Sequence, residues 1–422
     1  MSPTLATPAR YSSRGLIACH ACDGLHRLAP VPEGGKALCT RCGSLLYRNP
    51  RNSLDRSTAL YLSAFFLFAL ANAFPFIGLK VGDRIEQMHI VSAGLALFRQ
   101  GMGEIGALVL LTSVLCPLLA LGGMLSLLVP LRLGHRPAYM VPMWRMVRAI
   151  EPWSLGSVFM LALLVSIVKL QDLATLVPGI GLYSYVALLG VSAAAAASFD
   201  PGTLWPRLGP DVEAQDRRGR NAAAQGYTPC HTCDLLVKLE ADHGHADCPR
   251  CGTAVHGARL PDSLTRTWAL LFSATVLLIP ANVYPVMTVI QYGAGEPSTI
   301  LAGVIHLIEA GMWPLAMLVF FASFVVPITK IAVLALLLVT VRRGSRWRLR
   351  DRTLLYRVVE SVGAWSMVDV FLVGILVALV QMDALARVLP GIGAAFFAAS
   401  VVLTMIAAHT FDPRLVWDRA GR

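Results

Sequence analysis

Charged residues are scarce in this 422-residue chain. Asp, Glu, Lys and Arg make up only 14% of it, whereas hydrophobic residues make up 56%. A soluble domain carries roughly 25% charged residues, so the deficit excludes an ordinary soluble protein and favours lipid as the solvent. Several apolar runs reach the length of about 20 residues that a helix needs to cross a bilayer. The first 50 residues carry cysteine pairs rather than an apolar segment, so we expect no cleavable signal peptide.

The sequence also lacks the motifs of two common classes of membrane protein, nucleotide-driven transporters and oxidoreductases. It has no Gly-x-x-x-x-Gly-Lys-Ser/Thr loop, so we expect no nucleotide-driven motor in the chain itself. Histidines in the apolar runs are scattered, as His306 and His409 illustrate, and they form no facing pair for haem or quinone. A membrane oxidoreductase is therefore disfavoured, and we expect a protein that is not an enzyme.

The two halves of the chain repeat one another at a spacing of 209 to 212 residues. Chance does not keep that register over so many motifs, so it predicts a tandem duplication. The matching segments are Ser53–Arg56 with Ser263–Arg266, Ala71–Pro75 with Ala281–Pro285, Trp153–Ser154 with Trp365–Ser366, Pro178–Gly181 with Pro390–Gly393, and Phe199–Pro201 with Phe411–Pro413.

Each repeat contains a cysteine-rich segment and then four apolar spans. We therefore predict an all-α polytopic membrane protein with eight transmembrane helices and a small β content in the cysteine ribbons and outward loops. The expected domains are a first zinc ribbon at 1–52, a transmembrane unit at 53–205, a linker with a second ribbon at 206–260, and a second unit at 261–422. The expected spans are 57–79, 103–130, 153–170 and 179–198, then 267–290, 312–341, 364–381 and 391–410.

The basic residues indicate how the chain is oriented. Thirty of the 36 Lys and Arg residues lie in segments that an eight-span topology places on one side. By the positive-inside rule, we expect both termini and both cysteine segments to be cytosolic. The net charge of +11 could suggest a nucleic-acid partner. Because topology accounts for the placement of the charge, we expect none.

Eight of the nine cysteines form four Cys-x-x-Cys pairs outside the apolar runs. Two such pairs can supply four thiolates to one tetrahedral Zn²⁺, so we predict two structural zinc sites. Rubredoxin-like iron is an alternative, and disulfide redox pairs conflict with a cytosolic location. His20, His26 and His231 are additional possible ligands that four thiolates make unnecessary. The expected ligands are Cys19, Cys22, Cys39 and Cys42, and Cys230, Cys233, Cys248 and Cys251.

The second unit contains ionisable residues within its apolar spans, which by default indicates function. At ~1.5 Å per residue, Lys330 is expected about 15–18 Å below the cytosolic boundary and Asp369 about 8–11 Å below it. A Lys–Asp pair could carry a proton, or it could only pin two helices. The matching residues of the first unit are uncharged, which favours function. The expected network is Lys330, Asp369, Thr404, Ser323 and Ser366. In the first unit, the positions of Lys330, Asp369 and Thr404 are occupied by Ala120, Ser157 and Ser192.

Two further features lie near the expected membrane boundaries. Lys169 and Asp172 end the third span of the first unit, where they could line an outward-facing cleft or reach into water. Asn72-x-x-Pro75 recurs as Asn282-x-x-Pro285 in the first spans. A proline inside a helix removes a backbone bond, so we expect a kink with the asparagine amide capping the freed carbonyls.

This pattern resembles the paraquat-inducible protein A family of bacterial inner-membrane proteins. The resemblance covers nearly the whole chain: paired Cys-x-x-Cys ribbons, four-helix units, Asn-x-x-Pro segments and Pro-Gly-Ile-Gly turns. It implies a partner, an MCE-domain tunnel protein in the periplasm, and a cargo, membrane lipids, loaded or extracted at the tunnel base. The chain is similar in particular to the lipophilic envelope-spanning tunnel branch, which implies that the Lys169–Asp172 pair and the Lys330 network matter.

The resemblance leaves the energy source open, because an ion gradient or the lipid gradient itself could drive transport. Our mechanistic hypothesis is that protonation of Asp369, opposed by Lys330, shifts the second unit between two conformations. The alternative function is a membrane-anchored scaffold or stress sensor that acts through its cytosolic ribbons.

Overall fold

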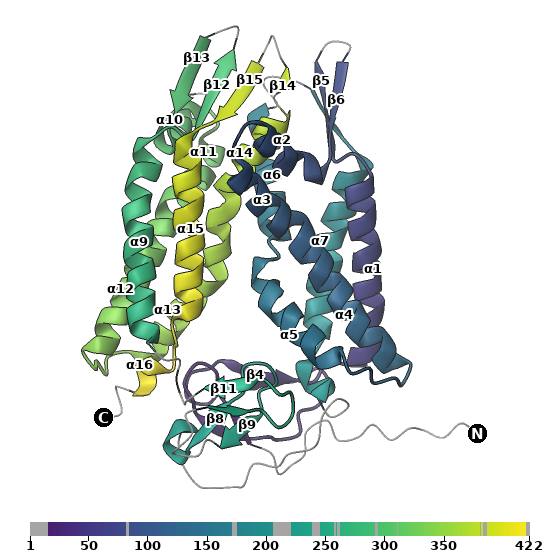
Figure 1. The fold of residues 1–422 in the computed structure, drawn as a ribbon, viewed down its shortest axis with the longest axis vertical. Helices are drawn as coiled ribbons and strands as arrows, with labels where there is room; N and C mark the ends of the chain where they lie inside the picture. Colours follow the sequence, from purple (N-terminus) through teal and green to yellow (C-terminus); the bar gives the residue numbers. More distant parts are fainter. Residues whose placement is uncertain are drawn as a thin grey trace.

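A computed structural model describes residues 16–81, 84–170, 175–205, 221–238, 245–256, 259, 262–291, 294–309, 311–379, 381–382 and 386–418. Within these residues eight helices are long and apolar enough to cross a membrane, as predicted, and the chain is a multi-pass membrane protein. The two helical units stand side by side (Figure 1). The cysteine-rich ribbons lie at one end of the bundles, here called the ribbon end. Small β-sheets cover the opposite end, here called the sheet end.

The first unit follows its cysteine ribbon along the chain. Its ribbon contains β1 (Leu16–Ala18), β2 (Leu25–Arg27), β3 (Lys36–Leu38) and β4 (Leu45–Arg48). The unit itself contains α1 (Ser53–Ala73), β5 (Ile77–Val81), β6 (Arg84–Met88), α2 (Ile90–Arg99), α3 (Gly103–Leu110), η1 (Leu111–Leu115), α4 (Cys116–Arg132), α5 (Met140–Ile150), η2 (Glu151–Trp153), α6 (Gly156–Leu170), β7 (Thr175–Pro178), α7 (Ile180–Ser198) and η3 (Pro201–Thr203).

The second unit repeats this order. Its ribbon contains η4 (Ala223–Gln225), β8 (Tyr227–Pro229), β9 (Leu236–Lys238), β10 (His245–Asp247) and β11 (Ala254–His256). The unit contains α9 (Ser263–Val283), β12 (Met287–Gln291), β13 (Ala294–Ser298), α10 (Ile300–Glu309), α11 (Trp313–Phe320), η5 (Phe321–Val325), α12 (Val326–Arg342), α13 (Leu349–Val362), η6 (Gly363–Met367), α14 (Val368–Leu379), β14 (Gln381–Met382), β15 (Ala386–Pro390), α15 (Ile392–Thr410) and α16 (Leu415–Asp418).

The first helix of each unit ends before its Asn-x-x-Pro proline, so the expected kink is absent. The helix α1 ends at Ala73 rather than 79, and Phe74 is extended, with φ −102° and ψ 153°. A residue that precedes proline avoids the helical region, because the proline ring would clash with its backbone. In the second unit α9 likewise ends at Val283 rather than 290. The asparagine amide does donate to a carbonyl one turn back, at 2.8 Å in each unit.

The second span of each unit contains a π-helical turn, η1 or η5, between two α-helices. Proline is the second residue of the α-helix that follows, Pro117 in α4 and Pro327 in α12. Proline has no N–H to donate to the carbonyl four residues earlier, and a π-helical turn accommodates that missing bond. The hydroxyls of Ser113 and Ser323 also donate to carbonyls of the preceding helix, four residues earlier, each at 2.7 Å.

The sheets at the sheet end tie the first and fourth helices of each unit together. The strand order is β6-β5-β7 in the first unit and β13-β12-β15-β14 in the second, all antiparallel. The β content expected in the outward loops is therefore present, with β5 and β6 forming a hairpin in the first unit. A Cβ on Gly179 would lie 2.1 Å from the carbonyl oxygen of Pro75, and a Cβ on Gly391 equally close to that of Pro285. Only glycine permits this approach.

The third span of each unit begins earlier than the expected 153 and 364. It includes α5 or α13, so the apolar helical stretches run from Met140 to Ile167 and from Leu349 to Ala378. These segments look amphipathic in the sequence because one face of each packs on its own bundle. Trp144 and Val147 of α5 are buried in this way, as are Tyr356 and Val359 of α13.

The two units share one continuous apolar core near the sheet end. Phe159 of α6 and Phe371 of α14 are fully buried, and their rings meet edge to face with centroids 5.5 Å apart. A Cβ on Gly374 of α14 would lie 3.2 Å from Leu97 of α2. The helix α14 therefore packs directly against the first unit, and the bundles form a single body at this end.

Candidate functional site

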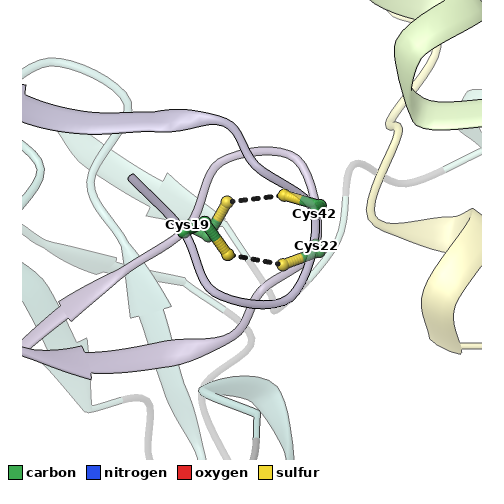
Figure 2. A group of neighbouring side chains, drawn as sticks. Cys19, Cys22 and Cys42 are labelled. Carbon is green, nitrogen blue, oxygen red and sulfur yellow. Dashed lines mark hydrogen bonds between the residues drawn. The ribbon is translucent and has the colours of Figure 1, made fainter. Parts of the chain in front are cut away.

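The four cysteines of the first ribbon point toward one another, as Figure 2 shows for Cys19, Cys22 and Cys42. The sulfurs of Cys19 and Cys42 are 3.5 Å apart, as are those of Cys22 and Cys39. All four lie within 4.8 Å of one another. Four thiolates at about 2.3 Å from a tetrahedral ion would be about 3.8 Å apart. The cluster thus has the donors and dimensions of a metal site.

The second ribbon repeats this geometry. Cys230 and Cys251 are 3.5 Å apart at sulfur, as are Cys233 and Cys248, and all four are buried. In both ribbons a glycine follows the last cysteine with positive φ, +76° at Gly43 and +61° at Gly252. Each donates its N–H to the carbonyl of the preceding knuckle cysteine, at 2.8 Å and 2.7 Å. This left-handed turn, natural for glycine, closes each knuckle around the thiols.

Hydrogen bonding among the thiols prepares them to bind a cation. The hydrogen bond with the Cys22 thiol lowers the pKa of Cys19 to about 4, and the same bond raises the pKa of Cys22. A lowered thiol pKa favours the thiolate, which is the form that binds metal. Nε2 of His26 lies 3.2 Å from the sulfur of Cys39. A ring nitrogen at that position can bond a ligand sulfur without being a ligand itself.

The two ribbons pack against each other as a pair. Nε2 of His20 is 3.2 Å from a carboxylate oxygen of Asp234, and this bond raises the pKa of His20. Both side chains are about half exposed, so solvent screens the pair. Better protected links join the backbone of Asn221 to Gly24 and the carboxylate of Asp23 to Arg259 at 3.1 Å. His20 therefore bridges the ribbons instead of ligating metal.

Each ribbon packs on the helices of the other unit. Buried cysteines of the first ribbon share an apolar cluster with α12, α13 and α15 of the second unit. Those of the second ribbon share a cluster with α4 and α5 of the first unit. Arg41 of the first ribbon stacks 4.4 Å over the ring of Trp417, and Arg250 of the second stacks 5.4 Å over that of Trp205. The indole of Trp144 donates to the carbonyl of Thr232 at 2.9 Å.

Lys330 is buried within the second unit, with only 2% of its surface exposed. Its ammonium lies 3.4 Å from the carbonyl oxygen of Gly363, at the start of η6. The ion pairs among the described residues do not include one between Lys330 and Asp369. The charged amine is therefore held by the backbone at the junction of two helices, and the expected Lys–Asp pair is not formed.

Asp369 lies farther from the ribbon end than the expected depth of about 8–11 Å. It occupies the first turn of α14, near the Ala378 end of the span that begins at Leu349. It also lines a cavity of about 40 Å³ with Ser298 and Thr299, which close the sheet-end hairpin. The expectation failed because it counted the third span from 364 rather than from 349. Lys330 thus bonds the first residue of η6, and Asp369 lies just after its last residue.

The hydroxyls of the expected network are all buried, but two of them bond their own helices. Ser323 donates to the carbonyl of Val319 at 2.7 Å, and Thr404 to that of Val401 at 2.8 Å. The hydroxyl of Ser366 is buried without a hydrogen-bond partner among the described residues. A buried hydroxyl that lacks a partner can form a hydrogen bond with a water or a ligand group.

The residues of the expected outward-facing cleft lie at the edge of the described part of the chain. Lys169 belongs to α6, but its side chain, and all of Asp172, fall outside the described residues. The structure instead contains a cavity of about 470 Å³ in the first unit, which we did not predict from the sequence. Its lining includes Ala120, Ser157 and Ser192, the positions that match Lys330, Asp369 and Thr404. That coincidence was the one signal that the sequence offered.

The comparisons with known proteins bear on the whole chain. The family model described as Paraquat-inducible protein A matches residues 54–209 and again residues 264–421. The chain belongs to the paraquat-inducible protein A family. The resemblance in the sequence is thereby confirmed, and the separate matches agree with the duplication. Among solved structures nothing matches.

Curated relatives of this family member cover nearly its full length. The Intermembrane transport protein PqiA of Escherichia coli is 35% identical over 412 residues, 96% of this chain and 95% of that protein. The Lipophilic envelope-spanning tunnel protein A of Escherichia coli is 29% identical over 401 residues, 95% and 90% of the two chains. The Probable intermembrane transport protein of Haemophilus influenzae is 27% identical over 410 residues, 95% of each.

Proposed function

We propose that this protein moves phospholipids between a bacterial inner membrane and a periplasmic tunnel of the MCE type. The names of its relatives, intermembrane transport protein and envelope-spanning tunnel protein, support transport rather than enzymatic catalysis. The eight apolar spans suit a cargo that is itself lipid. The observation that carries the proposal is the buried amine of Lys330, because a lone charge inside a bilayer is costly and is retained for function.

The charge at Lys330 gives the second unit a way to change conformation. Its ammonium bonds the carbonyl of Gly363, where α13 passes into the 3₁₀ turn η6. Asp369 begins the helix on the other side of that turn. A proton that leaves Lys330 weakens its bond to the carbonyl, and a proton that binds Asp369 removes the charge at the head of α14. Proton movement thereby biases the angle between α13 and α14, and a proton gradient can drive transport.

The orientation follows from the basic loops. We propose an inner-membrane protein whose termini and ribbons are cytosolic and whose sheet end faces the periplasmic tunnel. The units are residues 53–205 and 261–422, and the ribbons are 1–52 and 206–260. Each ribbon holds one structural Zn²⁺, which its four thiolates bind with no site open for catalysis. The zinc sites fix the ribbons so that they can lock the two units together.

The test is lipid transfer by the full chain in vesicles with an imposed proton gradient. Asp369→Asn and Lys330→Met keep side-chain size but abolish titration, and each should lower gradient-dependent transfer about tenfold or more, as loss of an acid–base group typically does. Leu336→Met on the lipid-facing side of α12 is the matched control and should transfer normally. Equal transfer by all three variants would rule out coupling through these residues.

The docking of each ribbon on the opposite unit favours a second function, a scaffold or sensor that acts through its cytosolic ribbons. It predicts that loss of metal changes the recruitment of a cytosolic partner, whereas Lys330→Met does not. Affinity purification from cells of a variant whose ribbon cysteines are replaced, and of Lys330→Met, separates the two proposals.

A further inference from the structure

We infer that the first-unit cavity is a phospholipid site that takes one acyl chain, with the phosphate at Arg148. This inference rests on the proposed function and adds to it a binding site in the unit that lacks the charged network. The cavity lies between α1, α4, α5 and α7, in the half of the unit nearer the ribbon end. Its volume of about 470 Å³ falls in the usual range for small-molecule sites, about 300–1,000 Å³.

The inner wall is apolar and suits a hydrocarbon chain. Phe68, Leu121 and Met124 line one side, and Leu188 and Leu189 line the other. The hydroxyl of Tyr185 is already bonded to the carbonyl of Gly156 at 3.2 Å, and that of Ser192 to the carbonyl of Leu189 at 3.1 Å. These polar groups are satisfied by the protein itself, so an apolar ligand leaves them undisturbed.

The cavity exists because small residues stand where the second unit has large ones. Ala120 occupies the position of Lys330, Gly156 that of Val368, and Ala193 that of Met405. In the second unit the long side chain of Lys330 fills this space and reaches the carbonyl of Gly363. Equivalent positions therefore leave space for a ligand in the first unit and hold a charged side chain in the second.

Charged residues gather at the ribbon end of the cavity, where the headgroup of a phospholipid would lie. Arg148 is about half exposed and pairs with Glu151 at 3.3 Å, one turn along the chain. An exposed pair of this kind is weak, so a phosphate can take the guanidinium with bidentate geometry. Arg48, from the first ribbon, also lines the cavity while it donates to the carbonyl of Phe199 at 2.8 Å. The cavity thus joins a cationic rim to an apolar interior, as a phospholipid requires.

The experiment uses the full chain in phosphatidylethanolamine vesicles that contain a trace phospholipid with a photoactivatable group near the end of one acyl chain. Peptide mass spectrometry should place crosslinks on the cavity side of α4 and α7, at Met124 and Leu188. The double variant Ala120→Leu, Ala193→Leu should lower these crosslinks about fivefold or more, which corresponds to about 1 kcal/mol of binding, because the added side chains occupy the space that an acyl chain needs. Ala197→Leu, exposed on α7 outside the cavity, should leave them unchanged.

Two outcomes would overturn the inference. One is equal crosslinking in the double variant. The other is crosslinking confined to the lipid-facing side of α4, at residues such as Leu118. If the double variant does not fold, Ala120→Val with a smaller filling group takes its place, and Arg148→Gln should weaken binding without altering the cavity walls. Transfer assays on Asp369→Asn decide the proposed function separately, because crosslinking in the cavity does not require transport.

Discussion

The crossed docking of the ribbons predicts that one tryptophan contributes measurably to holding the first ribbon on the second unit. Trp417 is buried, with Arg41 of the ribbon stacked 4.4 Å over its ring and its indole N–H donating to Thr353 at 3.0 Å. Replacement by leucine keeps an apolar side chain but removes both interactions. The stacking across the interface contributes about 0.5–2 kcal/mol, whereas the hydrogen bond lies within the second unit and fixes the indole beneath the guanidinium. A loss of about 2 kcal/mol corresponds to about a thirtyfold increase in transient opening.

The assay for Trp417→Leu is hydrogen exchange of the full chain, read by mass spectrometry on peptides that contain β3 and β4. Exchange should accelerate in these strands by about thirtyfold if local opening limits it. The matched control is Trp347→Leu, because Trp347 also has an arginine over its ring, at 5.3 Å, but lies exposed in the turn before α13. Unchanged exchange in folded Trp417→Leu, or equal acceleration in both variants, would refute the crossed docking.

Three other predictions follow from the metal clusters and the packing. A strong chelator should remove two zinc ions per chain and raise hydrogen exchange in both ribbons, as metal analysis of the same samples can check. Phe159→Ala should lower stability by about 3–5 kcal/mol in denaturant titrations, because the ring is fully buried between the units; the exposed Leu164→Ala should have little effect. Gly391→Ala should prevent folding because its Cβ would strike the carbonyl of Pro285, whereas Gly190→Ala, which meets nothing within 4 Å, should fold normally when both are compared by size-exclusion chromatography.

The sequence predicted the architecture well wherever a pattern was repeated. Eight spans, two four-cysteine clusters and hairpins at the end opposite the ribbons all follow from apolar length, spacing and alternation. These features depend on residues that are close along the chain. Duplication strengthened each of them, because an accidental pattern does not recur at a fixed interval.

Predictions failed where a boundary depended on three-dimensional packing. The run through Pro75 is apolar enough to continue α1, yet the extended residue before the proline ends it. The helices α5 and α13 lie before the expected starts of the third spans, at 153 and 364, yet both belong to the apolar stretches that form those spans. That second error also misplaced Asp369, because depth was counted from the wrong start.

The pairing of each ribbon with the opposite unit was beyond the reach of the sequence. Both ribbons carry the same knuckles, and both units present a tryptophan to an arginine, so the repeats alone fit either arrangement. The choice is made by contacts between residues far apart along the chain, such as Trp144 with the carbonyl of Thr232 and Arg350 with the carbonyl of Arg41. Sequence spacing carries no signal of such pairings.

Crossed ribbons and a shared core together restrict how the two units can move. At the sheet end Phe159 and Phe371 hold the units in direct contact, and at the ribbon end each ribbon is attached to the opposite bundle. A change of angle at η6 near Lys330 therefore cannot stay within the second unit, because α12 and α13 carry the first ribbon, whose Arg48 reaches the first-unit cavity. The path from the buried amine to the cavity runs through packed, hydrogen-bonded groups, so we expect a rearrangement at Lys330 to reach the cavity of the first unit.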